Sequence, residues 1–183
     1  MADLTELRRR PDIRGVDGVH LLPAVSRWIF RGGSAAQAAA AVPLAVTLPT
    51  TSCRSAYGPS CAALWLGPDE YLLLAPLTQG SSLASALEQA LAGLPHSLVD
   101  VSHRQVALEI RGPHAVALLS AGCPLSLDQD DFPPGACTRT LLGKADIVLW
   151  RTGAEAFHLE VWRSFASYVS NFLAEAAFDV DPA

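Results

Sequence analysis

Three residue types that together perform hydrolysis lie within one short segment, Asp100-Val101-Ser102-His103. In a serine hydrolase an aspartate orients a histidine, and the histidine removes the proton from the nucleophilic serine. Side chains alternate between the two faces of a strand, so Asp100 and Ser102 would point one way and His103 the other. The sequence also lacks the Gly-x-Ser-x-Gly elbow that exposes such a serine. We therefore predict a structural role for this segment rather than nucleophilic catalysis.

A second segment, Arg31-Gly32-Gly33-Ser34-Ala35, follows an expected strand and opens an expected helix, a context in which backbone N–H groups bind phosphate. The Gly-x-Gly-x-x-Gly pattern of dinucleotide sites is absent, as is the Walker motif. A dinucleotide site also needs an acidic residue about 20 positions further on for the ribose. None occurs between Asp17 and Asp69, which argues against a nicotinamide or flavin site here.

Residue types that bind metals are scattered rather than clustered. The cysteines form no Cys-x-x-Cys pair, the histidines show no i, i+4 spacing, and the acidic loop Asp128–Asp131 lacks the glycine and distal glutamate of an EF-hand. We therefore predict no metal site, and we expect the cysteines to be reduced thiols that fill small apolar spaces. The residues are Cys53, Cys61, Cys123 and Cys137, with His20, His96, His103, His114 and His158.

Tryptophan and arginine are adjacent twice, at Trp150-Arg151 and at Trp162-Arg163. Trp and Arg are enriched at the energetic centres of protein interfaces. The same pairs also occur where a tryptophan packs in the core and the arginine extends along the surface. Both interpretations stay open, and our interface candidates are Arg139, Trp150, Trp162 and Arg163.

The composition limits the classes of function. The 183 residues include 13 Lys and Arg and 18 Asp and Glu, a net charge of −5, which argues against binding nucleic acid or an anionic membrane through overall charge. Half of the residues are hydrophobic, 17% are charged and the mean hydropathy is +0.27, whereas an ordinary soluble domain has about 25% charged residues. Such a chain is not intrinsically disordered. Either a bias toward alanine and leucine or burial against another chain explains the excess of hydrophobic residues.

We expect no segment to enter a membrane. No apolar run reaches the roughly 18 residues that a transmembrane helix requires, because prolines interrupt the most apolar stretches. The acidic N-terminus has none of the apolar character of a secretory signal. We therefore expect a cytoplasmic protein.

Apolar periodicity predicts alternating strands and helices. We expect strands at 26–31, 61–66, 71–75, 98–110, 137–142, 145–151 and 156–162, with helices at 35–42, from 81, at 113–121 and from 164. Within 98–110 the apolar positions change from odd to even numbers, so a break must fall near Ser102–Gln105. Residues 47–60 are expected to form a loop.

The order of these elements repeats. Phe30-Arg31-Gly32 before a helix recurs 80 residues later as Ile110-Arg111-Gly112. Each copy is a strand, a helix, a hairpin and a helix, close to half of a ferredoxin-like unit plus a returning strand. We expect an α+β fold with two ferredoxin-like lobes, 19–97 and 98–177. A flexible arm, 1–18, would precede them and a tail, 178–183, would follow.

Five segments, in order along the chain, resemble the gamma subunit of heterotetrameric sarcosine oxidase. They lie between about Leu64 and Leu173, most of the chain, while the N-terminal third matches more loosely. That family is similar in turn to the folate-binding domains of glycine-cleavage aminomethyltransferases, so the resemblance implies their fold. The five segments are Trp65–Leu73, Asp100–Arg104, Ile110–Ala115, Phe132–Thr140 and Phe157–Phe165.

The resemblance implies a subunit that carries no cofactor of its own. In that family the holoenzyme oxidises sarcosine to glycine, passes the one-carbon unit to tetrahydrofolate and yields hydrogen peroxide. FAD, FMN, NAD and zinc would be bound by the other subunits. The expected partners are the alpha, beta and delta subunits, and this chain would be non-catalytic and stabilise the assembly.

One carboxylate keeps a second function open. The aminomethyltransferases place paired aspartates after a glycine turn to bind the folate amine, and the corresponding segment here, Gly143–Ile147, has Asp146 alone. The Trp162-Arg163 region replaces the asparagine that follows their next strand. The alternative is therefore a stand-alone folate-binding aminomethyltransferase-like protein that uses Asp146 and nearby Trp150. A folate-fold protein that maintains iron–sulfur enzymes is less well matched, because Gly135-Ala136-Cys137 departs from that family's Lys-Gly-Cys motif.

Overall fold

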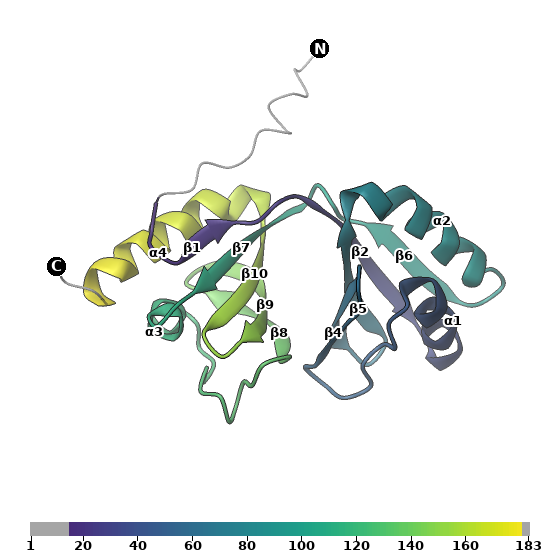
Figure 1. Cartoon of the computed structure of the whole chain (residues 1–183), viewed down its shortest axis with the longest axis horizontal. Coiled ribbons are helices and arrows are strands. Elements are labelled where there is room, and N and C mark those ends of the chain that lie inside the picture. Colours follow the sequence, from purple (N-terminus) through teal and green to yellow (C-terminus); the bar gives the residue numbers. More distant parts are fainter. Residues whose placement is uncertain (1–14, 181–183) are drawn as a thin grey trace, which may run out of the picture.

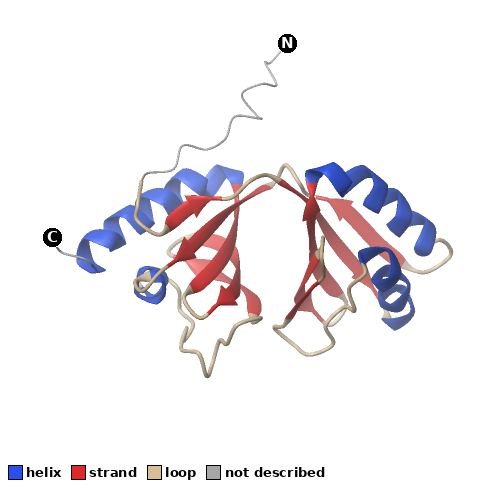
Figure 2. Cartoon of the chain, viewed as in Figure 1, coloured by secondary structure: helices blue, strands red, loops and turns tan. Residues whose placement is uncertain are grey.

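In the computed structural model, which describes residues 15–180, two antiparallel five-stranded sheets face each other across the molecule (Figure 1). Helices α1 (Ser34–Leu44) and α2 (Gly80–Ala90) cover the outer face of one sheet, and this half is named the first lobe. Helices α3 (Ala115–Ser120) and α4 (Ala166–Val180) cover the outer face of the other sheet, in the second lobe (Figure 2). Among the described residues, no helix has the length and apolar character needed to span a membrane.

The two sheets have the same strand order. The first-lobe order is β3-β4-β5-β2-β6, and the second-lobe order is β8-β9-β10-β7-β1. Each position in one list matches the same position in the other, so the repeat expected from the sequence is present in the topology. The first-lobe strands are β2 (Val25–Gly32), β3 (Ser55–Tyr57), β4 (Ala62–Gly67), β5 (Glu70–Pro76) and β6 (His96–Asp100). Those of the second lobe are β1 (Val19–Leu21), β7 (Gln105–Arg111), β8 (Cys137–Leu142), β9 (Ala145–Gly153) and β10 (Ala156–Trp162).

Two edge strands tie the halves of the chain together. β1 leads directly into β2, but it pairs with β7 of the second lobe, with Val19 opposite Ile110. β6 leads into β7, but it pairs with β2 of the first lobe, with Trp28 opposite Asp100. The expected boundary between residues 97 and 98 therefore falls inside β6, and residues 19–21 belong to the sheet of the second lobe. No single cut in the chain separates the two sheets.

The break expected near Ser102–Gln105 is confirmed. β6 ends at Asp100 and β7 begins at Gln105, and between them Arg104 N donates to Val101 O in a turn. Val101, the first residue after β6, is buried between the sheets, so the chain turns directly after this apolar side chain. The change of apolar phase in the sequence thus marks the crossing from one sheet to the other.

Several element ends differ from those expected. The segment 47–60 contains the short strand β3, and α1 continues through Pro43 to Leu44 before Ala45 adopts a left-handed conformation with φ 51°. Short 3-10 helices, η2 (Leu77–Gln79) and η3 (Arg163–Phe165), precede α2 and α4. A tight 3-10 turn is a common way to enter an α-helix, and it displaces the helix start from the predicted serine.

The ends of the chain also differ in part. α4 extends to Val180, into the segment 178–183 expected as a tail. The three arginines of the expected arm, Arg8–Arg10, lie outside the described residues. α3 begins at Ala115 rather than at Pro113, and Gly112, just before it, has φ 101°, a conformation that favours glycine.

Three apolar clusters hold the described residues together. In the first, β-strands pack on α1 and α2, where the i, i+4, i+8 leucines of α2 (Leu83, Leu87 and Leu91) are buried as their spacing predicts. In the second, strands of the second lobe pack on α3 and α4. The third cluster, named the seam, lies between the sheets and contains Ala62, Leu64, Leu72, Leu74, Val101, Cys137 and Val148. Since its members come from both sheets, the seam couples the lobes.

We predict that Leu64→Ala lowers the free energy of unfolding by about 2–5 kcal/mol, because it opens a cavity in the seam. Leu77→Ala is the matched control, since Leu77 is 55% exposed, and it should change the free energy by less than about 1 kcal/mol. Urea unfolding followed by far-UV circular dichroism and by tryptophan fluorescence measures both. Equal effects of the two variants, or two separate transitions in the wild type, would contradict a shared seam.

Candidate functional site

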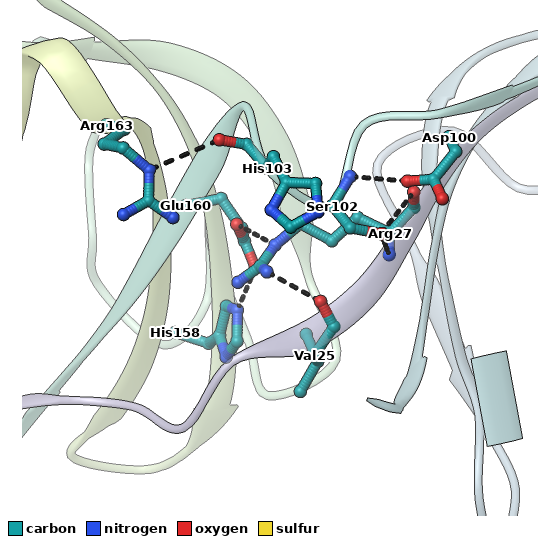
Figure 3. A network of polar contacts seen from close by, with 8 residues as sticks. All are labelled: Val25, Arg27, Asp100, Ser102, His103, His158, Glu160 and Arg163. Carbon is teal, nitrogen blue, oxygen red and sulfur yellow. Dashed lines mark hydrogen bonds and ion pairs between the residues drawn. The ribbon is translucent and has the colours of Figure 1, made fainter. Parts of the chain in front are cut away.

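A buried ion pair joins the two sheets (Figure 3). Arg27 on β2 donates from Nε to Glu160 Oε2 on β10 at 2.7 Å, and the two side chains are 2% and 0% exposed. Arg27 Nη1 donates to the Val25 carbonyl at 3.0 Å. His158 Nε2 lies 2.8 Å from Glu160 Oε1, so both carboxylate oxygens have a partner. A buried charge is tolerated only when its lone pairs are satisfied in this way.

The environment of Glu160 keeps it ionised. Burial alone would raise the pKa of Glu160, but the hydrogen bond and charge of His158 and the charge of Arg27 outweigh burial. The pKa of Glu160 therefore lies below its ordinary value. A hydrogen bond from His158 requires the proton on Nε2, so the carboxylate also fixes the orientation of this histidine.

The segment Asp100–His103 fastens the same region through its backbone (Figure 3). Ser102 Oγ accepts a hydrogen bond from Arg27 N at 2.9 Å, and Ser102 N donates to Asp100 Oδ1 at 2.8 Å. The His103 carbonyl accepts from Arg163 Nε at 3.3 Å. The serine hydroxyl therefore anchors β2 to the turn between β6 and β7, which agrees with the structural role predicted for this segment.

A cleft of about 250 Å³ lies between the sheets beside this network. It brings together three residues singled out in the sequence, Arg139, Asp146 and Trp162. The first lobe contributes Ile29, Leu66 and Leu72, and the second lobe contributes Arg104, Gln105, Arg139, Thr140, Asp146, Ile147, Val148 and Trp162. The cleft thus has an apolar side and a charged side.

The charged side of the cleft contains two arginines in different settings. The Arg104 guanidinium lies over the Trp162 ring, 5.6 Å from its centroid. Arg139 forms an ion pair with Glu70 across the lobes, and this hydrogen bond lowers the pKa of Glu70. Asp146 is exposed at the edge of the cleft. These groups suit a small ligand or a peptide side chain that carries charge.

Gln105 is the buried polar residue of the cleft. It is 5% exposed, and within residues 15–180 its Oε1 atom has no hydrogen-bond partner. A buried acceptor without a donor costs about 1–3 kcal/mol, so Gln105 is a local weak point in the packing between the sheets.

Two sequence candidates lie elsewhere. Trp150 stands opposite His158 in the sheet, with ring centroids 5.7 Å apart, and packs against the seam rather than in the cleft. Because Trp150 is four residues from Asp146 along β9, their α-carbons are about 13 Å apart. Arg163 lines a second cavity, of about 300 Å³, with Asp100, Ser102 and His103.

The sequence analysis missed Arg27, Glu160, Arg104 and Gln105. A usable signal existed for Glu160, because His158, Glu160 and Trp162 alternate with apolar residues on β10. Strict alternation places these polar residues on one face, which here faces the other lobe. The partner of Glu160 was not evident, since Arg27 lies 133 residues earlier.

Metal-ligating side chains are not clustered in the described part of the chain. No group of three or more His, Cys, Asp or Glu there is placed to hold a metal ion. The four cysteines are free thiols. Burial raises the pKa of Cys137 to about 12, so this thiol stays protonated and fills space in the seam.

The fold defines the class of protein first. The glycine cleavage system aminomethyltransferase T from Bartonella henselae matches with a TM-score of 0.63 at 16% identity, over 88% of this chain and 45% of that one. At that identity the likeness establishes the fold alone: a two-lobed α+β domain of the aminomethyltransferase type.

The family follows from closer matches. Residues 31–179 match the model of the sarcosine oxidase, gamma subunit family. Sarcosine oxidase subunit gamma from Arthrobacter sp is 36% identical over 145 residues, which is 79% of this chain and 70% of that protein. A chain in the heterotetrameric sarcosine oxidase from Corynebacterium sp. U-96, in complex with pyrrole 2-carboxylate, matches with a TM-score of 0.84 and 29% identity, covering 90% and 85% of the two chains. This protein belongs to the sarcosine oxidase gamma subunit family, and the resemblance found in the sequence is confirmed.

We predict that Glu160→Gln lowers the free energy of unfolding at pH 7 by about 3–5 kcal/mol, because it leaves the Arg27 charge buried without a counter-ion. Glu155→Gln, on the exposed turn before β10, is the control. The double variant Arg27→Met, Glu160→Leu should recover most of the loss, since it removes both charges. Denaturant unfolding measures all three, and an equally large loss in the double variant would contradict this account.

The same carboxylate predicts a pH dependence. Because the pKa of Glu160 is lowered in the folded protein, its stabilisation is complete above the unfolded glutamate pKa of about 4.3 and is lost as the pH falls through the folded value. Unfolding free energies measured between about pH 3 and pH 5 should therefore fall more steeply with acidification in the wild type than in Glu160→Gln. Parallel curves of unfolding free energy against pH for the two proteins would contradict this role of Glu160.

Proposed function

We propose that this chain is the gamma subunit of a heterotetrameric sarcosine oxidase and that it is a non-catalytic component which binds and stabilises the other subunits. The observation that carries the proposal is the match to a chain of the Corynebacterium complex over 90% of this chain. The engagement of Ser102, Glu160 and His158 in contacts that hold the sheets together also supports it, since these groups serve structure.

The proposal assigns the chemistry to the partners. The alpha, beta and delta subunits would carry FAD, FMN, NAD and zinc, and the complex would convert sarcosine to glycine, hydrogen peroxide and methylene-tetrahydrofolate in the cytoplasm. The family match and the high apolar content of the chain support this division, because a 50% hydrophobic chain gains from burial against a partner.

We also propose that the lobes are ferredoxin-like units with exchanged edge strands. The order β6-β2-β5-β4 in the first lobe and β1-β7-β10-β9 in the second support this, because each is a four-stranded antiparallel core covered by two helices, with β3 or β8 added at the edge. On this proposal the units expected at 19–97 and 98–177 interlock through β1 and β6.

Co-expression with the other subunits tests the function. We predict that the tagged chain co-purifies with them in equal proportion, and that the complex prepared without it loses thermal stability. The isolated chain should not oxidise sarcosine. Full activity and full stability of the complex without this chain, together with a soluble monomeric chain, would overturn the proposal.

The second candidate is folate binding by this chain, and the position of Asp146 beside Arg104 and Arg139 in the cleft favours it. The Asp146 carboxylate would bind the pteridine amine, and the rest of the folate would extend out of the cleft. On this reading, titration of the isolated chain with tetrahydrofolate quenches the tryptophan fluorescence and Asp146→Ala abolishes the quenching. Asp130→Ala, in an exposed loop, is the control. Unchanged fluorescence would contradict folate binding and leave the subunit role as the one remaining proposed function.

A further inference from the structure

Cations gather at one end of the second-lobe sheet. The turn between β8 and β9, the end of β10 and the start of β7 meet there, since Leu141 pairs with Asp146 and Trp162 pairs with Gln105. Of the nine Lys and Arg in residues 15–180, four belong to this region: Arg104, Arg139, Lys144 and Arg163. The carboxylates of this region are Glu70, which pairs with Arg139, and Asp100 and Asp146, so four positive and three negative side chains give a formal charge of +1. This end is positive in a chain whose net charge is −5.

Large apolar side chains are exposed at the same place. Leu141, Trp162 and Phe165 are 40% to 48% exposed, and they make up three of the eight exposed large hydrophobic residues within 15–180. The Trp162 ring is held under the Arg104 guanidinium, and Phe165 meets Tyr168 edge to face with centroids 6.3 Å apart. These contacts order the side chains before any partner arrives, which lowers the entropy cost of binding.

These residues form one surface, named the rim: Arg104, Leu141, Trp162, Arg163 and Phe165. The interlobe cleft lies beside it, since Arg104 and Trp162 line both. The cleft offers an apolar side formed by Leu66 and Leu72. A tryptophan and arginines around an apolar recess are the residue types that dominate binding energy in protein interfaces.

We propose that the rim is the docking surface for one partner subunit, and that this partner presents an acidic segment with an apolar side chain. The inference rests on the proposed function. Carboxylates of the segment bind Arg104 and the neighbouring positive charge, and the apolar side chain packs on Trp162 and enters the cleft. Charge complementarity selects this occupant over a second copy of the chain, because two positive rims repel each other.

The test measures binding of the full chain to the complex of the other subunits, at about 0.05 M and about 0.5 M NaCl. We expect Arg104→Glu and Trp162→Ala each to raise the dissociation constant about tenfold or more at low salt. Arg104→Lys, which keeps the charge, should fall between the wild type and Arg104→Glu. Affinity of the wild type should fall with salt, and that of Arg104→Glu should change less.

Two controls match these changes at the far ends of the second lobe. Arg111→Glu makes the same charge reversal at the other end of β7, and Phe178→Ala removes an exposed ring near the end of α4. The dissociation constants of both controls should stay within about twofold of the wild-type value. Thermal unfolding of each variant verifies folding, and the comparison of Arg104→Lys with Arg104→Glu decides the matter even if Trp162→Ala is unstable.

The outcomes separate the two proposals. If the wild type does not bind the other subunits, the proposed function fails and the rim assignment fails with it. If the wild type binds and the rim variants bind as tightly as the controls, the rim is not the docking surface, although the function stands. Equal losses in rim and control variants also overturn the assignment. Self-association of the isolated chain that Trp162→Ala abolishes would assign the rim to a second copy instead.

Discussion

The ion pair of Arg27 and Glu160 is the constraint on which the arrangement of the lobes depends. Each residue sits on an inner strand of its own sheet, so the pair fixes how the two sheets face each other. A buried charge without its counter-ion is strongly unfavourable, whereas displaced apolar contacts in the seam cost less per residue. The leucines of the seam therefore contribute attraction that tolerates small shifts of the lobes, and the ion pair selects one relative position.

The connections between the strands also fix the relative position of the lobes. β1 belongs to the second-lobe sheet, although β2, which follows it, lies in the first. β6 belongs to the first-lobe sheet, although β7, which follows it, lies in the second. The turn at Ser102 is hydrogen-bonded to the backbone of Arg27 beside the ion pair. The place where the chain crosses between sheets is thus also the place where the charges meet. Separation of the lobes would break the backbone bridge between Arg54 and Ala136, the buried pair and the seam together, so we infer that the lobes behave as one unit.

The sequence predicted the features that short-range patterns define, and it missed the pairings between segments far apart in the chain. Apolar alternation located the hairpins and the phase change before Gln105, because side-chain period follows directly from strand geometry. It could not place β1 in the distant sheet or match Arg27 with Glu160, since the pairing of strands and charges far apart in the chain leaves no local pattern. The residue types of the candidate site could be identified from the sequence, but their positions could not. Arg139, Asp146 and Trp162 share the cleft, while Trp150 packs against the seam.

The packing between the two sheets limits where this chain can bind a ligand or a partner. Leucines, Cys137, Trp150 and the ion pair occupy the space between the sheets, and the cleft that remains is about 250 Å³. Sites that enclose a drug-sized ligand usually measure roughly 300–1,000 Å³, so a folate bound here would extend well beyond the cleft. A single side chain fits such a space with its neighbours resting outside on Trp162 and Phe165. The aminomethyltransferase type of fold is thus combined here with a largely filled space between the sheets, which favours binding at the surface of the chain.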